Sequence, residues 1–221
     1  MLVDASSGGE ASPTRQRLSS AERRAAIVRT AIDLFAKRGF RGTTTRELAL
    51  AVGVSEPVLY QHFATKRDLY TAIVDQMVGE RAAEGDAALC QFHGTTDDRS
   101  FFQWFGEQVL NWYLDETNHI RLLLYSALEG HDLADIWHNR CTVQFIQIME
   151  QYVERRIAEG AFQNQNPVIA SRAFIGMICQ YGQVSAIYQR PASELSREEV
   201  VSQFVDIFLN GIRPDSTPGA R

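Results

Sequence analysis

Cysteine and proline are both scarce in this chain, with three cysteines and six prolines among 221 residues. Cys90, Cys141 and Cys179 are far apart and odd in number, so they predict neither a disulfide framework nor a zinc knuckle, and they suit a reducing cytoplasm. Stretches in which Val, Ile or Thr alternate with polar residues are nearly absent, which argues against a β-sheet protein. Apolar residues recur instead at three- and four-residue spacing, and the sequence therefore predicts an all-α fold.

Long hydrophobic segments are missing as well. Residues 1–14 lack the apolar core that a signal peptide needs. The most apolar stretch, residues 168–188, contains Arg172, Gln180 and Gln183, and a membrane span rarely carries three such groups. We therefore expect a soluble, cytoplasmic protein with no membrane partner, and we interpret this stretch as a buried helix.

The chain has no overall excess of positive charge, since its net charge is −5, and this argues against a general coat for nucleic acid. The charge is nevertheless unevenly divided. Residues 14–46 hold nine Lys and Arg against two Asp and Glu, whereas residues 83–221 hold ten against eighteen. This asymmetry suits a small module that faces a polyanion, carried by a larger body that does not. A solvated basic helix face would give the same counts, so charge alone leaves both interpretations open.

Capping signals mark the first helix. Ser19 and Glu22 have the spacing of a capping box, and Gly39 follows two cations, as is typical of a helix end. We therefore expect a helix over residues 20–38, preceded by a disordered basic arm over residues 1–18. Its apolar stripe would be Ile27, Ala31, Leu34 and Phe35.

Two shorter helices are predicted next. Thr44 and Glu47 repeat the capping box ahead of a helix that ends at Gly53, a residue free to take positive φ. Ser55 is then expected to cap a second helix with Pro57 in its first turn, where a missing N–H costs little. Two short helices joined by a Gly turn, here between about residues 44 and 63, form a helix-turn-helix, whose second helix enters the major groove of DNA.

The residues of this region closely resemble the N-terminal domain of the TetR (tetracycline-repressor-like) family. The resemblance covers about residues 20–70 without a gap and is carried by Gly39-Phe40, Thr43-Thr44-Thr45, Leu48-Ala49, Val52-Gly53-Val54-Ser55, Leu59-Tyr60, His62-Phe63, Lys66 and Leu69. It implies a three-helix DNA-binding domain over residues 19–66, joined to a larger helical domain for effector binding and dimerisation over residues 67–213, with a flexible tail over residues 214–221. It also implies a transcriptional regulator, most simply a repressor that a small effector releases from a palindromic operator.

The resemblance places the DNA contacts residue by residue, at Thr44, Arg46, Ser55, Glu56, Pro57, Val58, Tyr60, His62 and Lys66. Thr44, Tyr60, His62 and Lys66 resemble phosphate contacts, and Thr44 and Lys66 also stand at predicted helix N-termini, where amides favour an anion. Residues 55–58 would read base edges: Glu56 could accept from cytosine, and Pro57 or Val58 could touch a thymine methyl. The family often has Gly or Lys around positions 56 and 57, so the operator sequence is not implied. Tyr60 and His62 could instead only pack or cap.

The remaining helices are predicted at about residues 66–81, 99–115, 117–130, 132–159, 166–189 and 195–212, with residues 84–98 as a loop or short helical connection. The last two helices have more apolar surface than one core can cover, so we expect them to pair with a second copy in a four-helix bundle. The predicted homodimer contacts are Phe174, Met177, Ile178, Tyr181, Phe204 and Phe208. The alternative is that both helices are buried within the monomer.

Aromatic residues are concentrated in the middle of the chain. The resemblance implies an effector pocket there, and an apolar or aromatic effector would suit Phe101, Trp104, Phe105, Trp112, Tyr125, Trp137 and Phe145. Ordinary core packing would account for any one of these rings equally well.

Catalysis and metal chemistry find little support. His131, Asp135 and His138 could share one helix face, but they could also act as caps and first-turn acids, and we expect no metal and no cofactor. The cysteines have no readable His–acid partner, and neither a Gly-rich phosphate loop nor HExxH occurs, so we expect no enzyme. The alternative to a DNA-binding regulator is a helical protein-interaction module with no specific DNA role.

Overall fold

The computed structural model describes residues 19–92, 94–130, 132–188 and 194–213, and the side chains of residues 80–91, 132 and 133 are not described. Every regular element in these ranges is helical, which confirms the predicted all-α class. The predicted arm and tail, residues 1–18 and 214–221, lie outside the described residues. Within the described part of the chain, no helix combines the length and the apolar character needed to cross a membrane.

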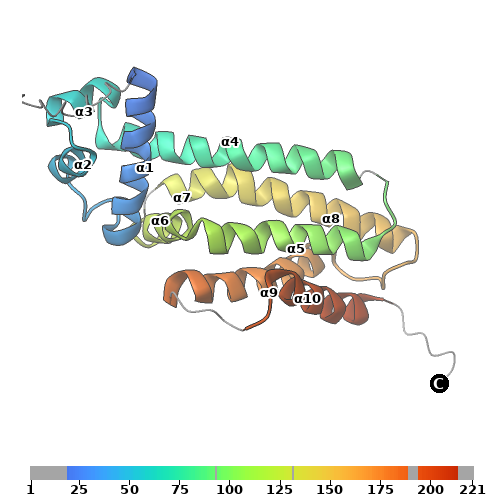
Figure 1. Cartoon of the computed structure of the whole chain (residues 1–221). Helices are drawn as coiled ribbons and strands as arrows, with labels where there is room; N and C mark the ends of the chain where they lie inside the picture. The colour runs from blue at the N-terminus through green and yellow to red at the C-terminus, as the bar shows by residue number, and fades with distance from the viewer. Residues whose placement is uncertain (1–18, 93, 131, 189–193, 214–221) are drawn as a thin grey trace, which may run out of the picture.

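One helix of 19 residues and two short helices form a unit at one end of the molecule (Figure 1). They are α1 (Ser20–Arg38), α2 (Thr45–Val52) and α3 (Glu56–His62), within a residue or so of their predicted bounds. Both predicted capping boxes are present, at Ser19 with Glu22 and at Thr44 with Glu47, and Gly53 ends α2 in the left-handed conformation at φ 78°. The expected side-chain cap at Ser55 is wrong, because its hydroxyl makes no cap hydrogen bond.

The fourth helix, α4 (Lys66–Phe92), joins this unit to the body and is longer than expected. The predicted end near residue 81, followed by a loop or short helical connection over residues 84–98, is wrong, because α4 continues without a break to Phe92. Gly79 and Gly85 lower helix propensity in this stretch, but alanines 82, 83, 87 and 88 favour the helix. Figure 1 shows α4 running the length of the body.

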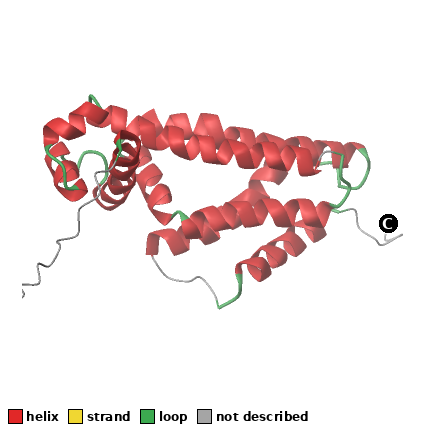
Figure 2. Ribbon diagram, turned by 45° about the horizontal axis from the view of Figure 1, so that its top comes forward, coloured by secondary structure: helices red, strands yellow, loops and turns green. Residues whose placement is uncertain are grey.

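The body contains α5 (Asp98–Asp115), α6 (Thr117–Leu128), α7 (Asp132–Trp137), η1 (His138–Thr142), α8 (Val143–Ala158), α9 (Pro167–Tyr188) and α10 (Arg197–Ile212). The predicted helix over residues 132–159 is interrupted by the π-helical turn η1, where the Val143 N–H donates to the His138 carbonyl. Helix α5 packs against both α9 and α10, and Figure 2 shows the long helices of the body lying side by side.

Two apolar cores hold these helices together. One is built from α1–α4 and also includes Leu122, Trp137 and Cys141 of the body; the other lies among α5, α8, α9 and α10. Tyr70 of α4 is fully buried in the first core and donates to the Leu122 carbonyl at 3.2 Å, and burial raises the pKa of its phenol to about 12. The first core therefore crosses the predicted domain boundary near residue 66, and the unit of α1–α3 is packed directly onto the body.

A buried ion pair fastens the end of the body that lies far from α1–α3. Asp98, 7% exposed, accepts from Arg156 Nε at 2.7 Å and from the Tyr152 hydroxyl at 2.8 Å. The hydrogen bond to Asp98 raises the pKa of Arg156, and burial followed by the same carboxylate raises the pKa of Tyr152. This network fixes the start of α5 against α8.

Candidate DNA-binding surface and effector cavity

The helix-turn-helix is held by its apolar face. Leu48 and Ala49 of α2, Leu59 of α3 and Phe63 are all buried in the first core. The opposite face of α3 therefore points outward, with Ser55, Pro57 and Tyr60 exposed and Glu56 and Val58 half-buried. The predicted base-reading residues thus share an accessible edge of the domain, as a recognition helix requires.

A chain of hydroxyl hydrogen bonds links α2 to α3. The Tyr60 hydroxyl donates to Thr45 Oγ1 at 3.3 Å, and Thr45 Oγ1 donates to Glu56 Oε2 at 3.2 Å. The sequence analysis included Thr45 in the family resemblance but predicted no role for it. Thr45 therefore orients Glu56 and Tyr60, one at each end of α3.

Thr44 and Arg46 lie exposed at the start of α2. Thr44 Oγ1 accepts from the Glu47 amide at 3.2 Å, and the Glu47 carboxylate in turn accepts from the Thr44 amide at 2.8 Å. These backbone and hydroxyl bonds lower the pKa of Glu47, and Arg38 adds to the effect with an ion pair at 2.6 Å. The box fixes the direction in which α2 presents both residues.

Lys66 is turned toward the protein. Its ammonium donates to the Phe40 carbonyl and lies 4.0 Å from the centre of the Phe40 ring. Partial burial lowers the pKa of Lys66, while Glu129 and Glu47 act in the opposite direction. A contact between Lys66 and a DNA phosphate would have to share or replace its bond to Phe40.

His62 is half-buried at the end of α3. Its carbonyl accepts from Arg24 of α1 at 2.7 Å, and the Arg24 guanidinium also lies 4.1 Å from the centre of the Phe63 ring. Arg24 therefore holds the end of the recognition helix, a role that the sequence did not reveal.

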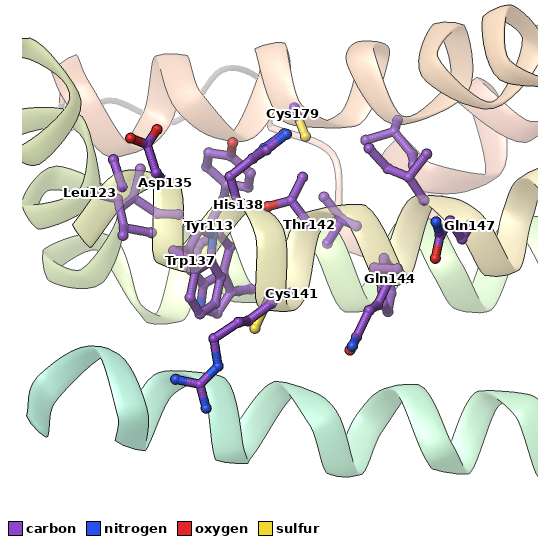
Figure 3. Close-up of a pocket in the computed structure, with 18 of the residues that line it drawn as sticks. Tyr113, Leu123, Asp135, Trp137, His138, Cys141, Thr142, Gln144, Gln147 and Cys179 are labelled. Atoms are coloured by element: carbon purple, nitrogen blue, oxygen red, sulfur yellow. The ribbon is translucent and has the colours of Figure 1, made fainter. Parts of the chain in front are cut away.

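A cavity of about 750 Å³ lies in the body among α5, α6, the α7–η1–α8 segment and α9 (Figure 3). Its aromatic wall includes Trp112 and Trp137, whose rings stack at 4.9 Å with an interplanar angle of 13°. Polar groups also face it, among them Tyr113, His138, Arg140, Thr142, Gln144 and Gln147. Burial, followed by the charge and hydrogen bonding of Cys179, raises the pKa of Tyr113. An apolar wall with a few polar groups is the usual form of a small-molecule site.

Three of the seven aromatic residues predicted for a pocket, Trp112, Trp137 and Phe145, line this cavity. The other four do not. Phe101 and Phe105 are fully buried in the second core, and Trp104 packs on rings there, including those of Phe92, Phe105 and Phe145. Tyr125 faces α1, where its hydroxyl donates to the Lys37 carbonyl at 3.4 Å. The concentration of aromatic residues in this part of the chain could not distinguish rings of the core from rings of the cavity wall.

The residues weighed as metal ligands are only partly placed. Asp135 and His138 both line the cavity, while His131 lies outside the described residues. Over the side chains that are described, no three His, Cys, Asp or Glu residues gather in a way that could hold a metal ion.

Helix α6 connects the cavity wall to the DNA-binding end. Its inner face lines the cavity, and its other face binds α1 through Asn118, Arg121 and Tyr125. Arg121 Nε donates to the Ala36 carbonyl at 3.1 Å, one of the last-turn carbonyls that a helix cannot satisfy by itself. The Glu129 carboxylate, just beyond α6, accepts from the amides of Phe40 and Arg41 at 3.2 and 3.3 Å.

The predicted dimer contacts divide into two groups. Phe174, Ile178 and Phe208 are buried inside the monomer, so for these three the expectation is corrected: they face the core shared with α5. Met177, Tyr181 and Phe204 are half-buried. Large apolar side chains do point outward from the same two helices, with Ile169 65% exposed on α9 and Ile207 62% exposed on α10.

Comparison with known proteins agrees with this architecture. Residues 27–73 match the family model described as bacterial regulatory proteins, tetR family, and residues 103–211 match the one described as AefR-like transcriptional repressor, C-terminal domain. The HTH-type transcriptional activator FasR of Mycolicibacterium smegmatis is 33% identical over 107 residues, so the match spans about half of each protein, 48% of this chain and 48% of FasR.

Two further relatives match over most of the chain. The HTH-type transcriptional repressor KstR2 of Mycolicibacterium smegmatis is 25% identical over 203 residues, covering 87% of this chain and 91% of KstR2. The crystal structure of AibR in complex with isovaleryl coenzyme A and operator DNA superposes with a TM-score of 0.66 at 19% identity, covering 84% of this chain and 97% of AibR. Because the two matching family models together cover most of residues 27–211, the chain belongs to the TetR family of bacterial transcriptional regulators.

Proposed function

We propose that this protein is a ligand-responsive transcriptional repressor that binds a palindromic operator as a homodimer and is released by a small effector. The observation that carries the proposal is the position of α6, which lines the cavity with Ile120, Leu123 and Leu124 and holds the end of α1 with Arg121 and Glu129. A ligand that shifts α6 would therefore shift the DNA-binding end with it.

In the proposed complex, α3 enters the major groove. Glu56 and Val58 would face base edges, while Thr44, Arg46 and Tyr60 would contact phosphates and fix the register. The hydrogen bonds of Thr45 support this assignment, because they hold Glu56 and the Tyr60 hydroxyl in set positions before DNA arrives. Lys66 would contribute only after its bond to the Phe40 carbonyl rearranges, whereas His62 would offer its side chain while its carbonyl stays bonded to Arg24.

A two-fold dimer would give the DNA-binding domains the symmetry of a palindrome. The outward face of α9 and α10, with Ile169 and Ile207, is the surface we propose for the dimer contact, since exposed apolar patches on two adjacent helices are typical of subunit interfaces.

The effector would be a small molecule with an aromatic or apolar portion that packs on Trp112 and Trp137. It would act by binding more tightly to the conformation that does not fit the operator, so DNA must weaken effector binding by the same factor. We propose that the protein binds this effector without turnover and works in the cytoplasm, where the operator is.

The experiment is a gel-shift and footprint on DNA upstream of its own gene, with Arg46→Ala, Tyr60→Phe and Arg99→Ala as variants. Arg99 lies on α5 far from the DNA-binding end, so Arg99→Ala is the matched control. We expect the wild-type protein and the control to protect the same palindrome, and the Arg46 and Tyr60 variants to bind more weakly with a shallower salt dependence for Arg46→Ala. Binding without sequence preference would contradict the proposed function. Full operator affinity in both the Arg46 and the Tyr60 variant would reject the assigned DNA contacts.

A further inference from the structure

The wall of the cavity holds one strong cation among its described lining residues, Arg140 of η1. Its guanidinium donates to Asp75 of α4 at 2.7 Å, and the two side chains are 51% and 53% exposed. Arg140 therefore stands where the cavity wall meets the helix that leads to the DNA-binding end.

The π-helical turn explains how Arg140 reaches this position. A π turn inserts an extra residue into a helix and widens it locally, and such turns occur often at functional sites. His138, Arg140, Cys141 and Thr142 of η1 all line the cavity. Cys141 is also buried in the core that includes α4, and Figure 3 shows its thiol directed toward that helix. One turn of chain thus faces the cavity and α4 at once.

The rest of the cavity wall suits the body of an amphiphile. Trp112, Trp137 and Phe145 provide apolar surface, and glutamines provide hydrogen-bonding groups that carry no charge. Asp135 is the one Asp or Glu among the described lining residues, and Figure 3 shows its carboxylate directed toward α9, whereas η1 faces α4 beneath it. The one Lys or Arg among the described lining residues, Arg140, therefore contacts α4, where Asp75 balances its charge.

We propose that the cavity takes a ligand with an apolar body and an anionic head, and that the head binds Arg140 in competition with Asp75. An ion pair between half-exposed side chains is weak, so a ligand anion that is also anchored by its apolar body can displace Asp75. A carboxylate, phosphate or sulfonate can bind the Arg fork through two parallel hydrogen bonds. Loss of the bond to Asp75 then removes the ion pair between α4 and η1 and leaves only their apolar packing.

The binding half of this proposal stands on the cavity alone, while its effect on DNA rests on the proposed function. Two fluorescent probes with similar aromatic bodies separate the charge from the apolar contact: anilinonaphthalene sulfonate, which is anionic, and phenylnaphthylamine, which is neutral. Both are titrated into the full-length wild-type protein and into the variants Arg140→Gln, Asp75→Asn and Arg99→Gln. Arg99 pairs with Asp206 at a similar exposure, 50% and 53%, so Arg99→Gln is a matched control outside the cavity.

We expect Arg140→Gln to bind the anionic probe about tenfold more weakly, as the loss of one charge-assisted contact predicts, and the neutral probe with unchanged affinity. Asp75→Asn should bind the anionic probe about two- to fivefold more tightly, because Arg140 no longer has a competitor. Arg99→Gln should match the wild-type protein with both probes. Equal binding of the anionic probe by wild type and Arg140→Gln, weaker binding by Asp75→Asn, or no binding of either probe to the wild-type protein overturns the proposal.

The effect on DNA is measured separately on the footprinted operator. The anionic probe should lower the operator affinity of the wild-type protein and leave that of Arg140→Gln unchanged. A protein that shows the expected probe affinities but no specific operator would contradict the proposed function and leave the ligand site standing. A protein that binds its operator but shows no charge preference in the cavity would contradict the ligand site and leave the proposed function standing.

Discussion

The contact between Glu129 and the end of α1 gives a prediction whose size can be worked out from the structure. Its carboxylate accepts from the amides of Phe40 and Arg41 at 3.2 and 3.3 Å, and its own carbonyl accepts from the Arg41 guanidinium at 3.2 Å. Glu129→Ala removes the carboxylate that accepts from both amides. Only the hydrogen bond from the Arg41 guanidinium to the carbonyl of residue 129 is left.

A hydrogen bond to a charged group contributes about 1.5–3 kcal/mol, but these two are at the long end of the usual range, and the bond from Phe40 is only half-buried while the bond from Arg41 is exposed. We therefore take about 1 kcal/mol for each bond and expect Glu129→Ala to lower the free energy of unfolding by about 2 kcal/mol. Glu129→Gln keeps an uncharged acceptor and should lose about half as much. The substitution also removes an anion that favours charged Lys66, so the pKa of Lys66 should fall further.

The assay is urea unfolding at a fixed protein concentration, because a dimer couples stability to concentration. A lower midpoint with an unchanged slope would show a loss of stability without a change in the surface exposed. Glu154→Ala, an exposed position on α8, is the control and should stay within about 0.5 kcal/mol of wild type. If Glu129→Ala also stays within about 0.5 kcal/mol, the bonds to α1 do not hold the two parts together and the reasoning fails.

Three other substitutions test the fold around the sites. Gly39→Ala should destabilise the protein by about 1–2 kcal/mol or more in thermal unfolding, because Gly39 has φ 71° and an added Cβ would collide with the Glu129 carboxylate; an unchanged midpoint would contradict this. Asp98→Ala should cost up to about 3 kcal/mol, since it removes the more buried of the two carboxylates that pair with Arg156 and leaves only Glu159, and a loss under about 1 kcal/mol would show that Glu159 or water replaces the carboxylate. The pKa of Glu47 is lowered in the folded state. The stability that the Glu47 carboxylate contributes to the fold is therefore present above the unfolded pKa of about 4.3 and is lost as the pH falls through the lower folded pKa. Glu47→Gln should therefore lose less stability than wild type between about pH 5 and about pH 3, and parallel pH profiles would refute that.

Local signals in the sequence predicted the DNA-binding end well, because capping is decided by residues three positions apart. Ser19 with Glu22 and Thr44 with Glu47 give the starts of α1 and α2 directly. The end of α4 was predicted wrongly because no comparable local signal marks it. No strong stop signal follows residue 81, and a glycine within a helix lowers its stability without ending it.

Contacts between distant segments could not be predicted in this way. The π turn at residues 138–142 adds one residue to an apolar pattern that still reads as a single helix, so neither the turn nor the pairing of Arg140 with Asp75 is visible in the sequence. The inward face of α9 carries Phe174 and Ile178, and apolar spacing cannot tell whether such residues face their own core or a second copy. Lys66 was placed on DNA by resemblance, while the neighbouring Phe40 carbonyl decides where its ammonium lies.

The length of α4 determines how far a small tilt of this helix would move the recognition helix. Its 27 residues span about 40 Å at the rise of an α-helix, and the recognition helix lies just ahead of its first turn. A tilt of about 5° about the far end of α4 would move that first turn by about 3.5 Å, close to the 3.4 Å between successive base pairs. In the proposed regulator, a small rearrangement at Asp75 that tilts α4 by this amount would displace α3 by about one base pair.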